Sequence, residues 1–223
     1  MRRTLTTVLF PALIAGPLAA QVGHAPASSP YRDIPDGKTF TLLYGKIAGD
    51  GGQLGVGAHD GKSYGVRFDV RVGAPIQLGL AVARGELKRL IFNSADTTSA
   101  AFRGPVSQDL TMVEAALQIN LTGHKTWYRL APFIGGSAGF VVGSDLPASQ
   151  PDSSGYRYGT KFYFAPAVGV RVFVTHSIHL RLEARQLYWK LTYPAGYSTK
   201  LASTNLQEWT GGRELRAGLG IGF

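Results

Sequence analysis

Residues 178–185 read Ile178-His179-Leu180-Arg181-Leu182-Glu183-Ala184-Arg185, and this stretch decides the fold. Every even-numbered residue is apolar and every odd-numbered residue is polar or charged. Successive side chains of a β-strand point to opposite faces, whereas a helix repeats its apolar positions every three or four residues. The stretch therefore predicts a strand with one apolar face and one charged face.

The same alternation recurs along the chain. It is clear in four further segments: residues 64–72, 112–121, 161–174 and 214–223. Weaker versions occupy three more: residues 39–48, 76–90 and 127–142. Together with residues 178–185 these segments give eight predicted strands, so we expect an all-β fold.

The segments between the predicted strands fall into two length classes. Three are tight turns: residues 73–75, 123–126 and 175–177. Four are long and polar: residues 49–62, 91–108, 143–159 and 192–212. Short turns at one end and long loops at the other are typical of an outer-membrane barrel, with the turns and both chain ends in the periplasm. We predict an eight-stranded antiparallel up-and-down transmembrane β-barrel.

Composition narrows the class of protein further. Hydrophobic residues make up 44% of the 223 residues, which is enough apolar material to exclude a fully disordered chain. Charged residues are only 17% and glycines number 29, which argues against long helices and coiled coils. With no cysteine, the chain has no thiolate metal site, no catalytic thiol and no disulfide.

The N-terminus has the pattern of a secretory signal. Arg2 and Arg3 precede an apolar stretch, and small residues follow it, so we expect residues 1–20 to be a cleaved signal peptide. Residues 21–37 are predicted to be a flexible periplasmic lead-in, and residues 38–223 to form the barrel. No later apolar run reaches the length of a membrane-spanning helix, which excludes a helical inner-membrane protein.

Several short stretches are similar to the small outer-membrane β-barrel family of OmpA-type and OmpX-type proteins. They are Pro132-Phe133-Ile134-Gly135-Gly136-Ser137-Ala138-Gly139, Leu182-Glu183-Ala184-Arg185 and a terminal phenylalanine. The resemblance implies an outer-membrane location and no cofactor. It also implies that the last strand carries the signal read by the barrel-assembly machinery, on Leu215, Ala217, Leu219, Ile221 and Phe223.

If the apolar faces meet lipid, the charged faces line the lumen. The predicted lumen charges are Arg67, Asp69, Arg71, Glu114, Arg129, Lys161, Arg171, Arg181, Glu183, Arg185, Glu214 and Arg216. An eight-stranded barrel is just wide enough for side chains to fill, and isolated buried ions are costly, so these groups should pair into a polar plug. Basic residues outnumber acidic ones eight to four, which leaves a narrow anion-preferring channel as an alternative.

Aromatic residues near the strand ends suggest girdles at the two membrane interfaces. The predicted girdle residues are Tyr64, Trp127, Tyr128, Tyr158, Phe162, Tyr188 and Trp189. Further aromatic and basic residues on the outer loops are candidate contact residues for lipopolysaccharide or other partners: Phe102, Arg103, Tyr156, Arg157, Tyr193, Tyr197, Lys200, Trp209 and Arg213.

Other chemistry finds little support in the sequence. Residues 57–63 lack the first glycine of a phosphate loop, and His176 and His179 have no convincing third metal ligand. The formal charge of +9 is spread over several strands, which argues against nucleic-acid binding.

Two further alternatives stay open. One is an enzyme that modifies lipid A, and the other is a soluble lipocalin-like barrel with its faces reversed. We expect a monomeric, non-enzymatic protein of the outer membrane that supports envelope integrity or surface contact through its loops.

Overall fold

The computed structural model describes residues 28–34, 37–92, 102–146, 155–197 and 205–223. The predicted signal peptide, residues 1–20, lies outside this part of the chain, as does Lys200. No helix among the described residues has the length and apolar character needed to cross a membrane.

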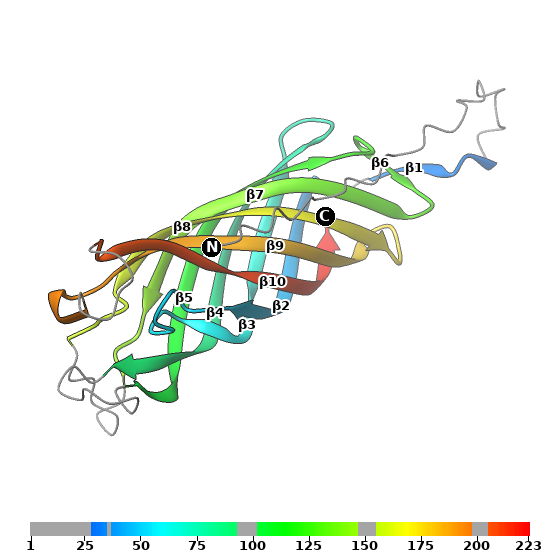
Figure 1. Ribbon diagram of the computed structural model, residues 1–223. Coiled ribbons are helices and arrows are strands. Elements are labelled where there is room, and N and C mark those ends of the chain that lie inside the picture. Colours follow the sequence, from blue (N-terminus) through cyan, green and yellow to red (C-terminus); the bar gives the residue numbers. More distant parts are fainter. Residues whose placement is uncertain (1–27, 35–36, 93–101, 147–154, 198–204) are drawn as a thin grey trace, which may run out of the picture.

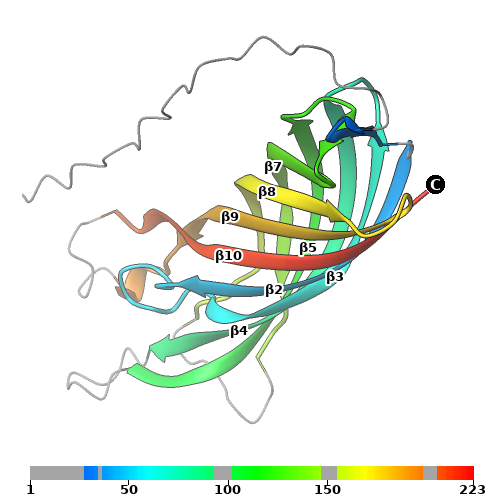
Figure 2. The same cartoon turned by 90° about the vertical axis from the view of Figure 1, so that its right-hand side faces the viewer.

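Eight long antiparallel strands close into a barrel (Figures 1 and 2), which confirms the predicted fold class. They are β2 (Lys38–Gly49), β3 (His59–Arg71), β4 (Ile76–Phe92), β5 (Phe102–Asn120), β7 (Leu130–Gly143), β8 (Thr160–Phe173), β9 (Ile178–Thr192) and β10 (Gln207–Gly222). Neighbours in the chain pair with one another, and β10 pairs with β2 from Gly212↔Gly49 to Gly222↔Thr39. This last pairing closes the barrel.

Alternation along each strand determines which side chains face outward. In β9, Leu180 and Leu182 are about half exposed, whereas Arg181 and Glu183 are buried at 2% and 6%. Leucines, valines and phenylalanines of the other strands likewise cover the exterior. The apolar stripes therefore form the outer surface and the charged stripes line an enclosed axis.

The strands are longer at the loop end of the barrel than the sequence pattern predicts. β5 starts at Phe102, ten residues before the predicted start, and β9 continues to Thr192. The β4–β5 pairing reaches Phe92↔Phe102, with one irregularity between Arg89 and Ile91. Much of the predicted loop 91–108 is therefore a continuation of this hairpin.

The turn end carries two short strands that the sequence did not predict. β1 (Tyr31–Asp33) pairs with β6 (Lys125–Trp127), so the described part of the predicted flexible lead-in, residues 28–34, is structured. Ile34 follows β1 and is buried against Ala131 and Phe173. This apolar anchor, together with β-pairing, gives the segment a fixed position beneath the barrel.

A tight turn separates β6 from β7 and corrects one predicted strand, residues 127–142. Tyr128 and Arg129 have φ values of 48° and 67°, and Trp127 pairs with Leu130 across them. Arg129 is consequently exposed in this turn and does not point into the lumen. The sequence gives little warning, because two-residue turns with positive φ normally use Asn-Gly.

Candidate functional site in the barrel lumen

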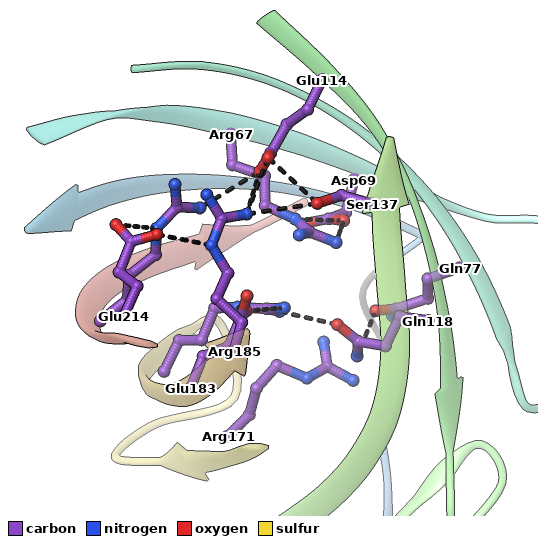
Figure 3. A network of polar contacts seen from close by, with 12 residues as sticks. Arg67, Asp69, Gln77, Glu114, Gln118, Ser137, Arg171, Glu183, Arg185 and Glu214 are labelled. Atoms are coloured by element: carbon purple, nitrogen blue, oxygen red, sulfur yellow. Dashed lines mark hydrogen bonds and ion pairs between the residues drawn. The ribbon is translucent and has the colours of Figure 1, made fainter. Parts of the chain in front are cut away.

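Four charged side chains meet in the middle of the lumen (Figure 3). Arg185 of β9 donates to Glu214 of β10 at 2.6 Å and to Glu114 of β5 at 2.7 Å. Arg216 of β10 donates to the same two carboxylates, at 2.8 Å to Glu214 and 3.1 Å to Glu114. The two arginines and two glutamates form a closed set of ion pairs, which we call the central quartet. It links β5 to β9 and β10 across the lumen.

Hydroxyl groups surround the quartet. Ser137 donates to Glu114 at 3.0 Å, Tyr163 also donates to Glu114, and Ser63 donates to Glu214. A buried carboxylate needs such donors because one counter-ion rarely offsets its lost hydration. The inward residues of β3, β7 and β8 therefore complete the environment of charges carried by β5 and β10.

A second polar layer lies between the quartet and the turn end. Arg67 pairs with Asp69 at 2.7 Å, and Arg181 pairs with Glu183 at 2.5 Å. Arg181 also donates to the Gln118 side chain at 2.7 Å and lies 4.2 Å from the centre of the Phe133 ring. Arg67 and Arg181 thus each pair with an acid on their own strand.

Amide side chains extend this layer toward the turns. Gln118 donates to Gln77 at 3.1 Å and to Asn120 at 2.8 Å, and Asn120 also accepts from Arg171 at 3.1 Å. His179 is buried nearby, and neither of its ring nitrogens has a hydrogen-bond partner within the described residues. No group of three potential metal-ligating side chains occurs in that part of the chain.

Nine of the twelve predicted lumen charges are buried in these layers. Of the other three, Arg71 is half-buried at the rim and donates to the Ile34 carbonyl at 2.9 Å. Lys161 is half-buried, with its ammonium 5.1 Å from the centre of the Tyr158 ring, and Arg129 is exposed. The predicted excess of positive charge therefore lies mainly outside the polar layers, which hold five arginines and four acids.

One small cavity lies within the polar layers. The cavity between Arg67, Phe133, Arg181 and Glu183 has a volume of about 10 Å³, which is enough for about one water molecule. Side chains therefore occupy the lumen at this level.

The lumen beyond the quartet, toward the loops, is mainly apolar, and sequence reasoning missed this. It also missed Arg89 of β4, which is buried in this half and donates to the Gln108 side chain at 3.1 Å. Ile47, Leu87, Leu110, Leu187 and Trp189 are all buried there in one cluster, which we call the apolar cap. The signal was available for Leu110, Leu187 and Trp189, because they alternate in step with the inward charges Glu114 of β5 and Arg185 of β9.

The outer loops complete the apolar cap. Val56 and Ala58 of the loop after β2 are buried in it, together with Tyr156, Tyr193 and Tyr197. These three tyrosines were predicted to be exposed contact residues, but they pack over the mouth of the barrel. Burial raises the pKa of Tyr193, and its hydrogen bond to the Glu208 carboxylate raises it further.

Two of the seven predicted girdle residues are also inside. Trp189 and Tyr158 are only 1% and 3% exposed and belong to the apolar cap. Trp189 lies on the same inward face of β9 as Arg185. Tyr158 precedes β8, in the loop that covers the mouth of the barrel. The other five lie on the exterior: Tyr64, Trp127, Tyr128, Phe162 and Tyr188.

Comparison with known proteins supports the fold. No protein-family model matches the chain, and no curated protein matches it in sequence. The crystal structure of Neisserial surface protein A is similar, with a TM-score of 0.56, 16% identity and coverage of 84% of this chain and 97% of that one. The outer membrane protein OprG from Pseudomonas aeruginosa is also similar, with a TM-score of 0.51, 13% identity and coverage of 87% of this chain and 99% of that one. The expected resemblance to small outer-membrane β-barrels is therefore confirmed for the fold.

Proposed function

We propose that the chain is a non-enzymatic, monomeric outer-membrane barrel with a lumen closed by its own side chains, which supports envelope integrity or surface contact through its loops. The observation that carries this proposal is the burial of ten charged side chains inside a barrel with an apolar exterior. Such a barrel is stable in lipid because a closed ladder leaves no unpaired strand edge in the membrane.

Closure of the lumen has two independent components. The central quartet and the layer beneath it fill the axis with paired charges, and the apolar cap covers them at the loop end. An ion would have to displace several buried ion pairs and then cross an apolar layer. A non-conducting barrel therefore fits the arrangement better than the narrow anion channel.

The exterior supports a place in the outer membrane. Leu215, Leu219, Ile221 and Phe223 are about half exposed or more on the outside of β10, and Ala217 is exposed with them. In this proposal the barrel-assembly machinery reads this stripe, and membrane lipid and lipopolysaccharide surround the folded barrel. A cleaved signal peptide would direct the chain to the periplasm.

The enzyme alternative has little support among the described residues. His176 and Ser177, the adjacent pair considered for acyl transfer, are exposed in the turn between β8 and β9, and no hydrogen bond joins their side chains. A serine hydroxyl needs an oriented base to become a nucleophile.

Conductance tests the proposal directly. The protein is refolded into lipid vesicles, and heat-modifiable gel mobility first establishes that the barrel has inserted. The same vesicles are then fused with a planar bilayer. We expect no steady current in chloride salts. A stable current from gel-verified, inserted protein would contradict the closed lumen.

A further inference from the structure

The loop end has a discontinuity between β2 and β10. Their pairing ends at Gly212↔Gly49, whereas β10 continues with β9 as far as Gln207↔Thr192. Residues 50–53 cross beside this extension and are attached to it by side chains. The Asp50 carboxylate accepts from the Thr210 hydroxyl at 3.0 Å, and the Glu208 carboxylate accepts from the Gln53 N–H at 2.9 Å.

A cavity of about 410 Å³ lies at this junction. Its lining includes Asp50, Gln53, Gln186, Tyr188, Glu208 and Trp209. The volume falls within the usual range of small-molecule sites. Two carboxylates, two amides and two aromatic rings thus surround one opening.

Both carboxylates are positioned through a single oxygen. Oδ1 of Asp50 accepts from the Gly52 N–H and from Thr210, and Oε1 of Glu208 accepts from Gln53 and Tyr193. Oδ2 of Asp50 and Oε2 of Glu208 accept no hydrogen bond from the described residues. Each group therefore keeps one oxygen available to a ligand while the other fixes its orientation.

Gly52 is required for this arrangement. Its φ is +83°, and a Cβ at this position would lie 2.2 Å from Oε1 of Glu208 and 2.7 Å from the Tyr193 hydroxyl. A larger residue would displace the carboxylate from the cavity. The backbone at Gly52 thus lies so close to the Glu208 side chain of β10 that no side chain fits between them.

Trp209 and Tyr188 line the cavity from the barrel exterior, whereas Glu208 lines it from the opposite face of β10, because neighbouring side chains of a strand alternate in direction. Trp209 is 60% exposed and Tyr188 is 36% exposed. The Phe164 ring packs against both, with its centre 5.9 Å from that of Trp209 and 4.9 Å from that of Tyr188. These rings are supported by strand packing and lose little side-chain freedom when a ligand covers them.

We propose that this cavity binds a neutral pyranose unit of a glycan. A sugar ring presents C–H groups on its faces, which pack on aromatic rings, and hydroxyl groups at its edge, which donate to carboxylates and amides. Two carboxylates disfavour an anionic ligand, and an acyl chain would leave them without partners. The described residues offer too few acidic or histidine ligands for a metal site.

The proposal deepens the proposed function, because it gives the surface-contact role a site and a class of ligand. The sugar could belong to a free polysaccharide or to the glycan of a neighbouring glycolipid in the outer leaflet. Both present the same pyranose chemistry to the cavity, so the experiment distinguishes them by the choice of probe.

The test uses the whole barrel folded in nanodiscs of a phosphatidylcholine without glycolipid. Maltohexaose, chitohexaose and deacylated lipooligosaccharide are titrated separately, and binding is measured by ligand-observed NMR. We expect at least one probe to bind with a dissociation constant of about 1 mM or tighter. Binding of a hexaose assigns a free glycan, and binding of lipooligosaccharide alone assigns a glycolipid.

Variants separate the cavity from the rest of the surface. Trp209→Ala, Asp50→Asn and Glu208→Gln should each weaken binding at least tenfold, whereas Glu86→Gln, an exposed carboxylate on β4, should leave it unchanged. Gel mobility verifies that each variant is folded, and Trp209→Ala perturbs no described hydrogen bond.

Absence of binding by all three probes, or equal binding by wild type and the cavity variants, would overturn the inference. A silent bilayer recording of the same protein would leave the closed-lumen proposal intact, so the two failures are distinguishable.

Discussion

The two halves of the lumen differ in chemistry although they belong to the same eight strands. Toward the turns, charges fill the axis and apolar side chains cover the exterior, as at Arg67 inside and Phe68 outside. Toward the loops, on β2 to β4, the relation is reversed: Ile47 and Leu87 are buried while neighbouring Lys46 and Glu86 are outside. The same eight strands therefore present an apolar exterior suited to lipid in one half and a polar exterior suited to water in the other.

The largest effect is expected from breaking the polar half at Glu114. Glu114→Gln leaves Arg185 and Arg216 with one shared carboxylate in a buried site. Removing one partner of a buried ion pair costs about 3–5 kcal/mol of unfolding free energy. Urea unfolding of the barrel in vesicles measures this loss. The control is Glu86→Gln, which removes an exposed ion pair with Lys62 and should cost less than about 1 kcal/mol of unfolding free energy. Equal losses in the two variants would contradict the expected difference between buried and exposed ion pairs.

A smaller loss is expected in the apolar half. Leu187 is fully buried in the apolar cap, so Leu187→Ala should cost about 3 kcal/mol through lost packing and a residual cavity. Because no charge is involved, the loss should be the same at low and high salt. Thr192→Ala, on the exposed face at the end of the same strand, should change stability by less than about 0.5 kcal/mol. A Leu187→Ala loss as small as this would show that the cap is loosely packed.

The anchor at the turn end should contribute less than either lumen half. Ile34→Ala removes an apolar side chain from a small cluster of three residues, and we expect a loss of about 2 kcal/mol in the same unfolding measurement. The control is Asp33→Asn, which weakens only an exposed contact with His124. If both variants unfold like wild type, β1 adds no stability to the barrel.

The smallest effect concerns pH at the loop end. The Gly52 N–H lowers the pKa of Asp50, and the Thr210 hydroxyl lowers it further. A carboxyl with a lower pKa in the folded state stabilises the fold above its unfolded pKa, and this contribution is lost as pH falls through the folded pKa. Because Asp50 is largely solvated, wild type should exceed Asp50→Asn by less than about 0.5 kcal/mol at pH 7 and lose this advantage as pH falls through the folded pKa of Asp50. A difference that does not change with pH would contradict the assignment.

Sequence alternation was sufficient for the existence of the eight barrel strands, although not for all their bounds, and for most of the buried charges. Arg67, Arg181 and Glu214 follow from parity alone, because the period of a strand leaves only two faces. Parity failed at Arg129, where we extended a strand through a turn formed by residues that rarely adopt positive φ. Trp189 was misplaced because its position near a strand end was given more weight than its parity.

Other features depend on contacts between distant segments, which a local pattern cannot show. Ile34 anchors the lead-in only because Ala131 and Phe173 lie beneath it. The sugar cavity depends on where β2 ends relative to β10, since this offset brings Asp50 beside Glu208. Neither relation is visible in a single stretch of sequence.

The central quartet can form only when the last strand, β10, pairs in the correct register. Glu214 and Arg216 arrive with the last strand, while Arg185 and Glu114 are carried by strands made earlier. A one-residue slip of β10 would turn both of its charges toward the exterior and leave Arg185 and Glu114 paired only with each other. Correct closure of the barrel and completion of the buried ion pairs are therefore reached in the same step, and a misaligned final strand loses the ion pairs that Glu214 and Arg216 make.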